Sequence, residues 1–126
     1  MISTILQVAL GGAIGASLRY LSGVAVTRAW GAGGFPLGVI GVNILGSGVM
    51  GLLVAVMAAR GLTHWAPFLV TGLLGGFTTF SAFSLEAVTL YERGALGQAA
   101  AYVGLSVGLS LAALVAGLWL GREILT

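Results

Sequence analysis

Four long apolar segments, separated only by short polar stretches, constrain this chain more than any other feature. A transmembrane helix needs about 20 mostly apolar residues. Windows of that length cover 4–25, 36–59, 66–91 and 97–120. Only 6% of the 126 residues are charged, whereas soluble domains carry about a quarter. We therefore expect one all-α integral membrane domain, residues 1–126, with four transmembrane helices in the plasma or inner membrane and in contact with lipid.

The side-chain inventory excludes several classes of function. The chain has no Cys and no Lys, and His64 is its single histidine. The lack of Cys removes disulfides and thiolate metal sites. Without Lys or a run of Arg, no basic patch is available for nucleic acid. Because His64 lies in a connection with no neighbouring carboxylate, we expect no enzymatic activity.

Charge is nearly balanced between the two ends of the spans. With four spans, Arg60 and Arg122 flank one side of the membrane, and Arg28 and Arg93 flank the other, with Arg19 near that second side. Orientation normally follows an excess of Lys and Arg in cytoplasmic loops, which is almost absent here. We expect insertion in both orientations and an antiparallel, dual-topology homodimer. The alternative is a fixed orientation set by one or two charges.

Arg19 and Glu86 are the only ionisable residues inside the expected spans. At 1.5 Å per residue they lie about 9 Å and 7.5 Å from the same membrane side. An intramembrane charge is a functional candidate by default, and the two side chains either pair or extend to the interface. Asn43 lies at a similar depth, where its amide makes a helix–helix hydrogen bond or contacts a ligand.

The middle of the third span is a poor helix former. Residues 75–84 read GGFTTFSAFS, with two glycines followed by β-branched and aromatic residues. We expect a break near residue 77, close to the bilayer midplane, where freed carbonyls need protein or ion partners. In an antiparallel dimer, carbonyls of both protomers would meet on the two-fold axis and suit a hard monovalent cation. The alternative is a kinked but packed helix.

Two side-chain patterns indicate a path for an anion. Phe80 and Phe83, three residues apart, place two rings on one helix side, and ring edges are electropositive. Tyr102, Ser106 and Ser110 stack three hydroxyls along one helix face. Each pattern also has a structural explanation, since phenylalanines pack in cores and serines bond the carbonyl four residues back.

Glycine, with 22 residues, recurs in pairs four residues apart that favour close helix contact. In so glycine-rich a chain, no single pair identifies an interface. The pairs of two small residues are Gly11 with Gly15, Gly12 with Ala16, Ser47 with Gly51, Gly72 with Gly76, Gly104 with Gly108, and Gly117 with Gly121.

Three motifs together resemble the Fluc (CrcB) family of small fluoride channels. They are GASLRY at 15–20, GVNILG at 41–46 and GGFTTFSAFS at 75–84. The resemblance covers essentially the whole chain, and the third motif is the most specific. It implies a fluoride-selective channel that gives passive fluoride efflux and so protects against fluoride toxicity. It further implies an antiparallel homodimer with two pores and a central sodium ion.

The resemblance also implies roles for individual residues. Phe80 and Phe83 would line the pores, with Asn43 contacting fluoride or orienting the rings. The hydroxyls of Tyr102, Ser106 and Ser110 would form a polar track beside them.

Further roles follow by position. The backbone carbonyls of Gly75 and Thr78 would hold the sodium ion, and Arg19 and Glu86 would lie in the vestibule. Ala82 stands where typical members have Thr, which removes a hydroxyl beside the rings. The nearest substitutes are Ser81, a further pore candidate, and Ser84.

Two other classes remain open. A proton-coupled exporter resembling the small multidrug transporters has a similar size, but those proteins depend on a carboxylate in the first helix. The chain has no Asp, and its first span has no carboxylate, only the amide of Gln7 and the guanidinium of Arg19. Proton exchange would therefore rest on Glu86 alone. The third class is a non-transporting accessory subunit.

Overall fold

The computed structural model describes residues 1–31 and 34–124, and this part of the chain is helical with no strands. In chain order its elements are α1 (Ile2–Trp30), α2 (Leu37–Arg60), η1 (Thr63–Trp65), η2 (Pro67–Leu74), α3 (Gly75–Phe77), α4 (Phe80–Glu92) and α5 (Leu96–Ile124). They form four stretches long and apolar enough to cross a membrane: Ile2–Trp30, Leu37–Arg60, Thr63–Glu92 and Leu96–Ile124. Four apolar helices were expected from the sequence, and most of the observed ends lie a few residues beyond the predicted ones.

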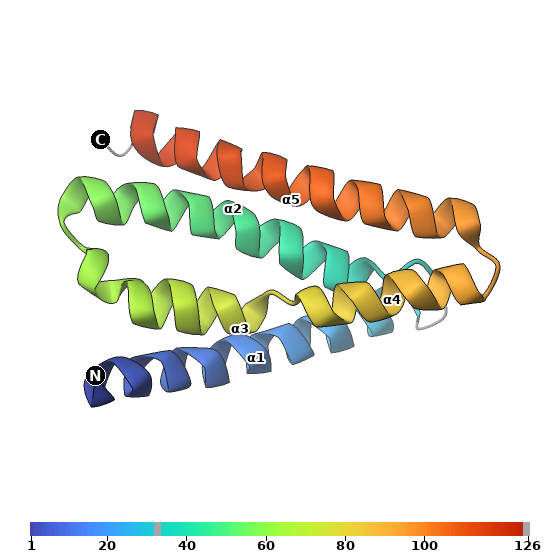
Figure 1. Cartoon of the computed structure of the whole chain (residues 1–126), viewed down its shortest axis with the longest axis horizontal. Coiled ribbons are helices and arrows are strands. Elements are labelled where there is room, and N and C mark those ends of the chain that lie inside the picture. The colour runs from blue at the N-terminus through green and yellow to red at the C-terminus, as the bar shows by residue number, and fades with distance from the viewer. Residues whose placement is uncertain (32–33, 125–126) are drawn as a thin grey trace.

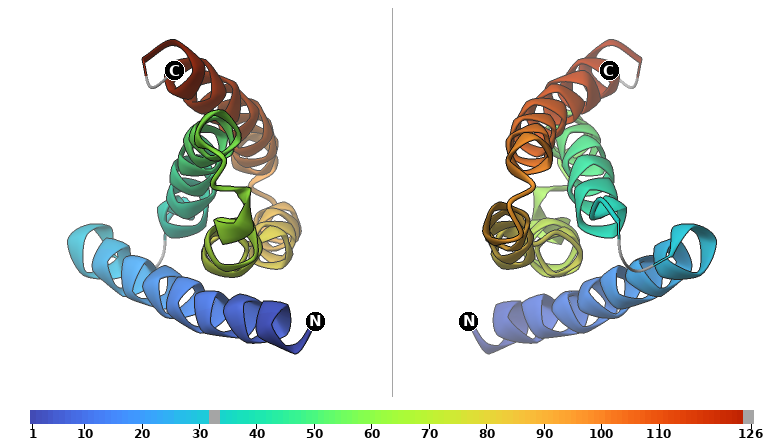
Figure 2. Two further views of the ribbon diagram at one scale, coloured as in Figure 1. Left: turned by 90° about the vertical axis from the view of Figure 1, so that its left-hand side faces the viewer. Right: turned by 90° about the vertical axis from the view of Figure 1, so that its right-hand side faces the viewer.

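The four stretches run antiparallel along one long axis, with both termini at the end that also carries η1 (Figure 1). In the two end-on views, η2, α3 and α4 lie between α1 and the α2–α5 pair (Figure 2). The third stretch therefore contacts neighbours on both sides. This central place matters because the third stretch is also the irregular one.

Glycines allow α1 to lie directly on the third stretch. A Cβ at Gly15 would overlap the carbonyl oxygen of Leu73, and one at Gly76 would lie 2.8 Å from the carbonyl oxygen of Gly12. Two of the small-residue pairs thus mark the interface of α1 with η2 and α3. They are Gly11 with Gly15 on α1, and Gly72 with Gly76 on the third stretch. The backbones touch here because side chains are absent.

The α2–α5 interface is built in the same way. A Cβ at Gly51 would overlap the carbonyl of Leu114, and one at Gly117 would overlap the carbonyl of Gly48. By contrast, Gly104 and Gly108 have open space where a Cβ would be. Only some of the glycine pairs therefore mark contacts within this chain.

The third stretch is interrupted at Thr78 and Thr79, which confirms the bend expected there. α3 ends at Phe77, and the two threonines have extended φ/ψ values of −85°/159° and −153°/121°. α4 then restarts at Phe80, with Thr79 as its N-cap residue: the Thr79 hydroxyl accepts a hydrogen bond from the Ala82 N–H at 3.1 Å. Before the break, η2 is wound as a π-helix, which the sequence did not predict.

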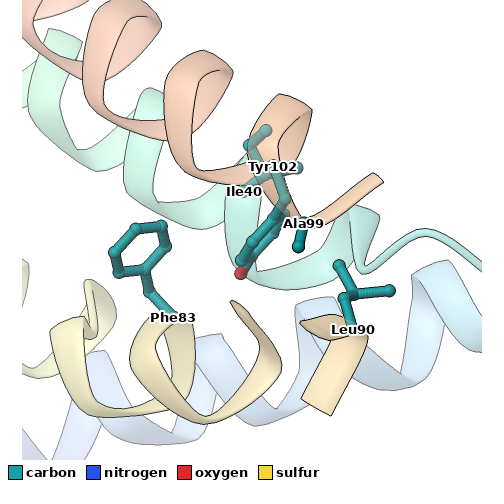
Figure 3. Packing of buried hydrophobic residues seen from close by; sticks show 5 residues of the cluster. All are labelled: Ile40, Phe83, Leu90, Ala99 and Tyr102. Carbon is teal, nitrogen blue, oxygen red and sulfur yellow. The ribbon is translucent and has the colours of Figure 1, made fainter. Parts of the chain in front are cut away.

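A small core forms where α2, α4 and α5 meet (Figure 3). Its buried members are Ile40, Phe83, Leu90, Ala99 and Tyr102. Tyr102 is fully buried, at 0% exposure, and its ring stands between α5 and α4 with the hydroxyl directed toward α4. This core fixes the start of α4, and so it fixes one side of the break.

Candidate pore and ion site

A cavity of about 340 Å³ opens beside the helix break, and we call it the inner cavity. Its lining comes from α2, from the break and α4, and from α5: Asn43, Ser47, Met50, Thr78, Thr79, Phe80, Phe83, Ser106, Val107, Ser110 and Leu111. Most of the predicted pore residues are thus brought to one place. None of the lining residues carries an ionisable side chain in the part of the chain that the structure describes.

The Asn43 amide bonds the backbone of the break twice. Its Nδ2 donates to the Thr79 carbonyl at 3.0 Å, and its Oδ1 accepts from the Thr79 N–H at 2.8 Å. These bonds compensate a backbone that has left the helical ladder. The interhelical hydrogen bonding considered from the sequence is therefore present. An amide has two N–H donors, and the second one is not needed for this contact.

Two aromatic rings, Phe80 and Phe83, line the cavity, and a third ring, Tyr102, packs against Phe83. The ring centroids of Phe80 and Phe83 are 5.4 Å apart at an interplanar angle of 44°. Phe83 is also stacked on Tyr102 at 5.4 Å and 29°. Phe83 is 8% exposed, whereas Phe80 is 77% exposed. One ring is therefore anchored in the core, and the other is presented at the surface of the protomer.

The predicted hydroxyl column lies behind these rings on α5. In the described part of the chain, the Tyr102 hydroxyl and the Ser106 Oγ are buried and have no hydrogen-bond partner. A buried hydroxyl without a partner costs about 1–3 kcal/mol, so such groups point to a water or ion partner. Ser106 and Ser110 both line the inner cavity. Tyr102 does not line this cavity, so the column contributes the Ser106 and Ser110 hydroxyls to its wall, and the Tyr102 hydroxyl lies in the core.

The break also changes the partners of two backbone carbonyls. In a continuous helix, the N–H groups of Thr79 and Ala82 would donate to the carbonyls of Gly75 and Thr78. Here the Thr79 N–H donates to Asn43, and the Ala82 N–H donates to the Thr79 hydroxyl. The two carbonyls named from the sequence as sodium ligands are thus among those that lose their helical donors.

α2 approaches the break through Gly46. A Cβ at this position would overlap the Thr78 methyl group and lie 3.3 Å from the Phe77 ring. The Thr78 hydroxyl is itself bonded to the Leu74 carbonyl at 2.9 Å. The side chain at the break is therefore held from two directions.

A larger cavity of about 770 Å³, the outer cavity, opens on the other side of the break, toward the α1–α2 connection and the end of α4. Its charged lining residues are Arg19, Arg28, Glu86 and Arg93. Thr79 lines both cavities and so lies between them. Both predicted vestibule residues are in this outer cavity.

Arg19 does not pair with Glu86 within the described residues. Its Nε instead donates to the Gly76 carbonyl at 3.1 Å, joining α1 to the end of α3. Arg19 is partly buried there. The sequence left two arrangements open for Arg19, pairing with Glu86 or extension to the interface. The Arg19 Nε does neither, because it is bonded to the Gly76 carbonyl.

Some site residues were missed or placed elsewhere. Thr79 was not predicted, although a Thr before a renewed apolar run is a common helix-start signal. Ser47 and Met50 also line the inner cavity, and no sequence pattern marked them as pore residues. Ser81 is exposed beside the break, with its Oγ 3.3 Å from the Thr79 hydroxyl. Ala82, the departure from the typical pattern, lines the outer cavity.

Comparison with known proteins gives consistent matches over the whole chain. The family profile described as "CrcB-like protein, Camphor Resistance (CrcB)" matches residues 6–118. A protein of Ruegeria sp. (strain TM1040) called "Fluoride-specific ion channel FluC" is 68% identical over 126 residues, covering 100% of both chains. A protein of the same name from Cereibacter sphaeroides is 66% identical, over 94% of this chain and 94% of its own length. Another, from Roseobacter denitrificans, is 59% identical, over 96% of this chain and 97% of its own length.

Proposed function

The chain belongs to the CrcB family, and from this premise we propose that it is a fluoride-specific ion channel that lets fluoride leave the cell passively. The family resemblance drawn from the three sequence motifs is thereby confirmed. The relatives are named as channels and not as enzymes, and the four apolar stretches fit a multi-pass membrane protein. Efflux of this kind protects a cell against fluoride toxicity.

The inner cavity supports the proposal, because it is lined by neutral hydrogen-bond donors and by no charged side chain among the described residues. Fluoride is small and strongly hydrated, so a selective pore must replace its water with hydrogen-bond donors. Within the described residues, the buried hydroxyl of Ser106 in the cavity wall has no partner, and neither has that of Tyr102, which stacks on Phe83. Ser110 and the spare N–H of Asn43 add donors, and the ring edges of Phe80 and Phe83 add positive partial charge. A wall without fixed cations binds the ion weakly enough to release it.

A second copy of the chain completes the site in this proposal. Non-helical backbone at membrane depth is tolerated only where protein buries it or water lines it. The break is open in one protomer, with Gly75 and Phe80 exposed. An antiparallel homodimer would cover both breaks at the two-fold axis, with one inner cavity per protomer, giving two pores. The near-balanced arginines support insertion in both orientations.

The same dimer would place a sodium ion at its centre. Backbone carbonyl oxygens suit hard cations, and those of Gly75 and Thr78 have lost their helical donors. When bound, the ion supplies a positive charge that satisfies carbonyls from both protomers. The chain's own contribution is the pair of side-chain bonds, from Asn43 and from the Thr79 hydroxyl, that diverts the competing N–H groups.

The charge distribution weighs against a proton-coupled exporter. Glu86, the only carboxylate inside a predicted span, lines the outer cavity and not the inner one. An accessory subunit would leave the unpaired hydroxyls of Tyr102 and Ser106 unexplained. Passive conduction uses both features without further assumptions.

Fluoride efflux from liposomes tests the function. Purified protein is reconstituted in vesicles loaded with potassium fluoride, and valinomycin sets the voltage. A channel releases fluoride with no pH gradient and retains chloride in parallel vesicles. Efflux that occurs only with an imposed pH gradient would instead indicate the exchanger.

A further inference from the structure

Arg19 lies where α1 reaches the end of α3. Gly15, one helical turn before it, lies against the Leu73 carbonyl, and Gly76 lies against Gly12. With the two backbones in contact, the Arg19 side chain extends along α3 to its last turn. There its Nε donates to the Gly76 carbonyl at 3.1 Å.

The Gly76 carbonyl is one of the groups that the break leaves without a helical donor. In a continuous helix it would accept from the Phe80 N–H, but Phe80 lies beyond the break, in the first turn of α4. Carbonyls at a helix C-terminus attract cations and are often bonded by Arg or Lys. Within the described residues, the Gly75 and Thr78 carbonyls, on either side of Gly76, accept no hydrogen bond from a side chain.

We propose that Arg19 is a positioning residue of the helix break: it holds the Gly76 carbonyl toward α1 and leaves the carbonyls of Gly75 and Thr78 to bind sodium. This inference rests on the proposed channel function and its sodium site. It assigns Arg19 a role that depends on the Nε donor, whereas attraction of anions into the outer cavity would depend only on its charge. The two roles can be separated because donor and charge can be removed one at a time.

Three substitutions separate them. In Arg19→Gln, the amide nitrogen lies the same number of bonds from Cα as Nε does in Arg, so the donor stays and the charge goes. In Arg19→Lys, a methylene occupies the Nε position, so the charge stays and the donor there goes. Arg19→Met removes both. Arg28→Gln is the matched control, because Arg28 lines the same outer cavity and gives no bond to the break.

The readout is the sodium concentration that gives half-maximal fluoride efflux from liposomes. We expect Arg19→Gln and Arg28→Gln to stay close to the unsubstituted protein. Arg19→Lys and Arg19→Met should need about tenfold more sodium, the size expected when one charged hydrogen bond is lost. The proposal would be overturned if Arg19→Lys needed no more sodium than the unsubstituted protein. It would also be overturned if Arg19→Gln needed more sodium and Arg19→Lys did not.

A second measurement does not depend on transport. Hydrogen–deuterium exchange of peptides spanning 72–84 should be faster in the Lys and Met variants than in the Gln variant, because the end of α3 loses its tie to α1. Equal exchange in all three would also overturn the proposal. If the unsubstituted protein released no fluoride at any sodium concentration, the proposed function itself would fail, and the exchange result would still decide whether Arg19 holds the break.

Discussion

The Asn43 side chain hydrogen-bonds both the N–H and the carbonyl of Thr79, at 2.8 and 3.0 Å, and so substitutes for the helical ladder at the break in the third stretch. This pair of bonds connects α2 to the point where the backbone of the third stretch leaves the helix. It also faces the inner cavity, so the element that stabilises the break is part of the wall of the proposed pore.

Replacing Asn43 should therefore affect stability and conduction together. Asn43→Ala leaves two backbone groups of Thr79 without partners, and each costs about 1–3 kcal/mol when buried. We expect a lower unfolding temperature in detergent and a large loss of fluoride efflux. Asn43→Asp keeps an acceptor for the Thr79 N–H, but it replaces the donor with a charged carboxylate oxygen that faces the Thr79 carbonyl. It should therefore also lose stability and efflux, and stability equal to that of the unsubstituted protein in both variants would contradict the role given to the amide.

The two phenylalanines should separate stability from conduction. Phe80→Ile changes a ring that is 77% exposed in the protomer, whereas Phe83→Ile changes one that is 8% exposed and stacked on Tyr102. We expect both to suppress fluoride efflux and the proposed dimer to remain assembled, with only Phe83→Ile costing stability, by roughly 1–3 kcal/mol.

Phe68→Ile serves as the control for this pair. Phe68 lies in η2 against Trp65, with ring centroids 6.5 Å apart, away from both cavities. Its efflux should match that of the unsubstituted protein. Normal efflux in both Phe80→Ile and Phe83→Ile would remove these rings from the pore.

Two glycines of one motif on α2 give a matched test of the packing around the break. Gly46→Ala places a methyl group against Thr78, whose hydroxyl bond to Leu74 resists rotation. Gly41→Ala meets open space and should be neutral or slightly stabilising, since Ala favours helix by about 1 kcal/mol over Gly. We expect reduced thermal stability and efflux for Gly46→Ala alone. Similar behaviour of the two variants would argue against a tight contact at this point.

Dual topology can be tested with one thiol in this Cys-free chain. Thr63 is exposed at the start of η1, where the third stretch begins, and Thr63→Cys changes no charge. An impermeant maleimide should label about half of the protein from each face of the membrane if the arginines set no orientation. Gly94, at the tip of the next connection, is less suitable because its φ of 81° disfavours a side chain. Labelling from a single face would establish a fixed orientation.

Composition and periodicity were sufficient for the architecture. The apolar windows gave four helices, and the GGFTTF stretch indicated the break, because glycine and β-branched residues are poor helix formers. The i, i+4 spacing placed Ser106 and Ser110 on one face, and both line the inner cavity. These features depend on local chemistry, which a sequence displays directly.

The partners across the break could not be read in the same way. That Arg19 bonds Gly76, and not Glu86, depends on how closely α1 approaches α3. The two hydrogen bonds between Asn43 and Thr79 likewise depend on the register of α2 against the third stretch. Register is set by glycine contacts such as those of Gly15 and Gly46, and single glycine pairs occur too often in this chain to identify an interface.

Passive and selective conduction of fluoride by neutral donors beside the break can be tested with one electrical measurement. Purified protein in a planar bilayer, with sodium on both sides, is given fluoride in one chamber and chloride in the other, at equal pH. We expect a steady current whose reversal potential lies near the equilibrium potential of fluoride. A silent bilayer with protein that still takes up fluoride under a pH gradient, or a current that reverses near the chloride potential, would contradict it.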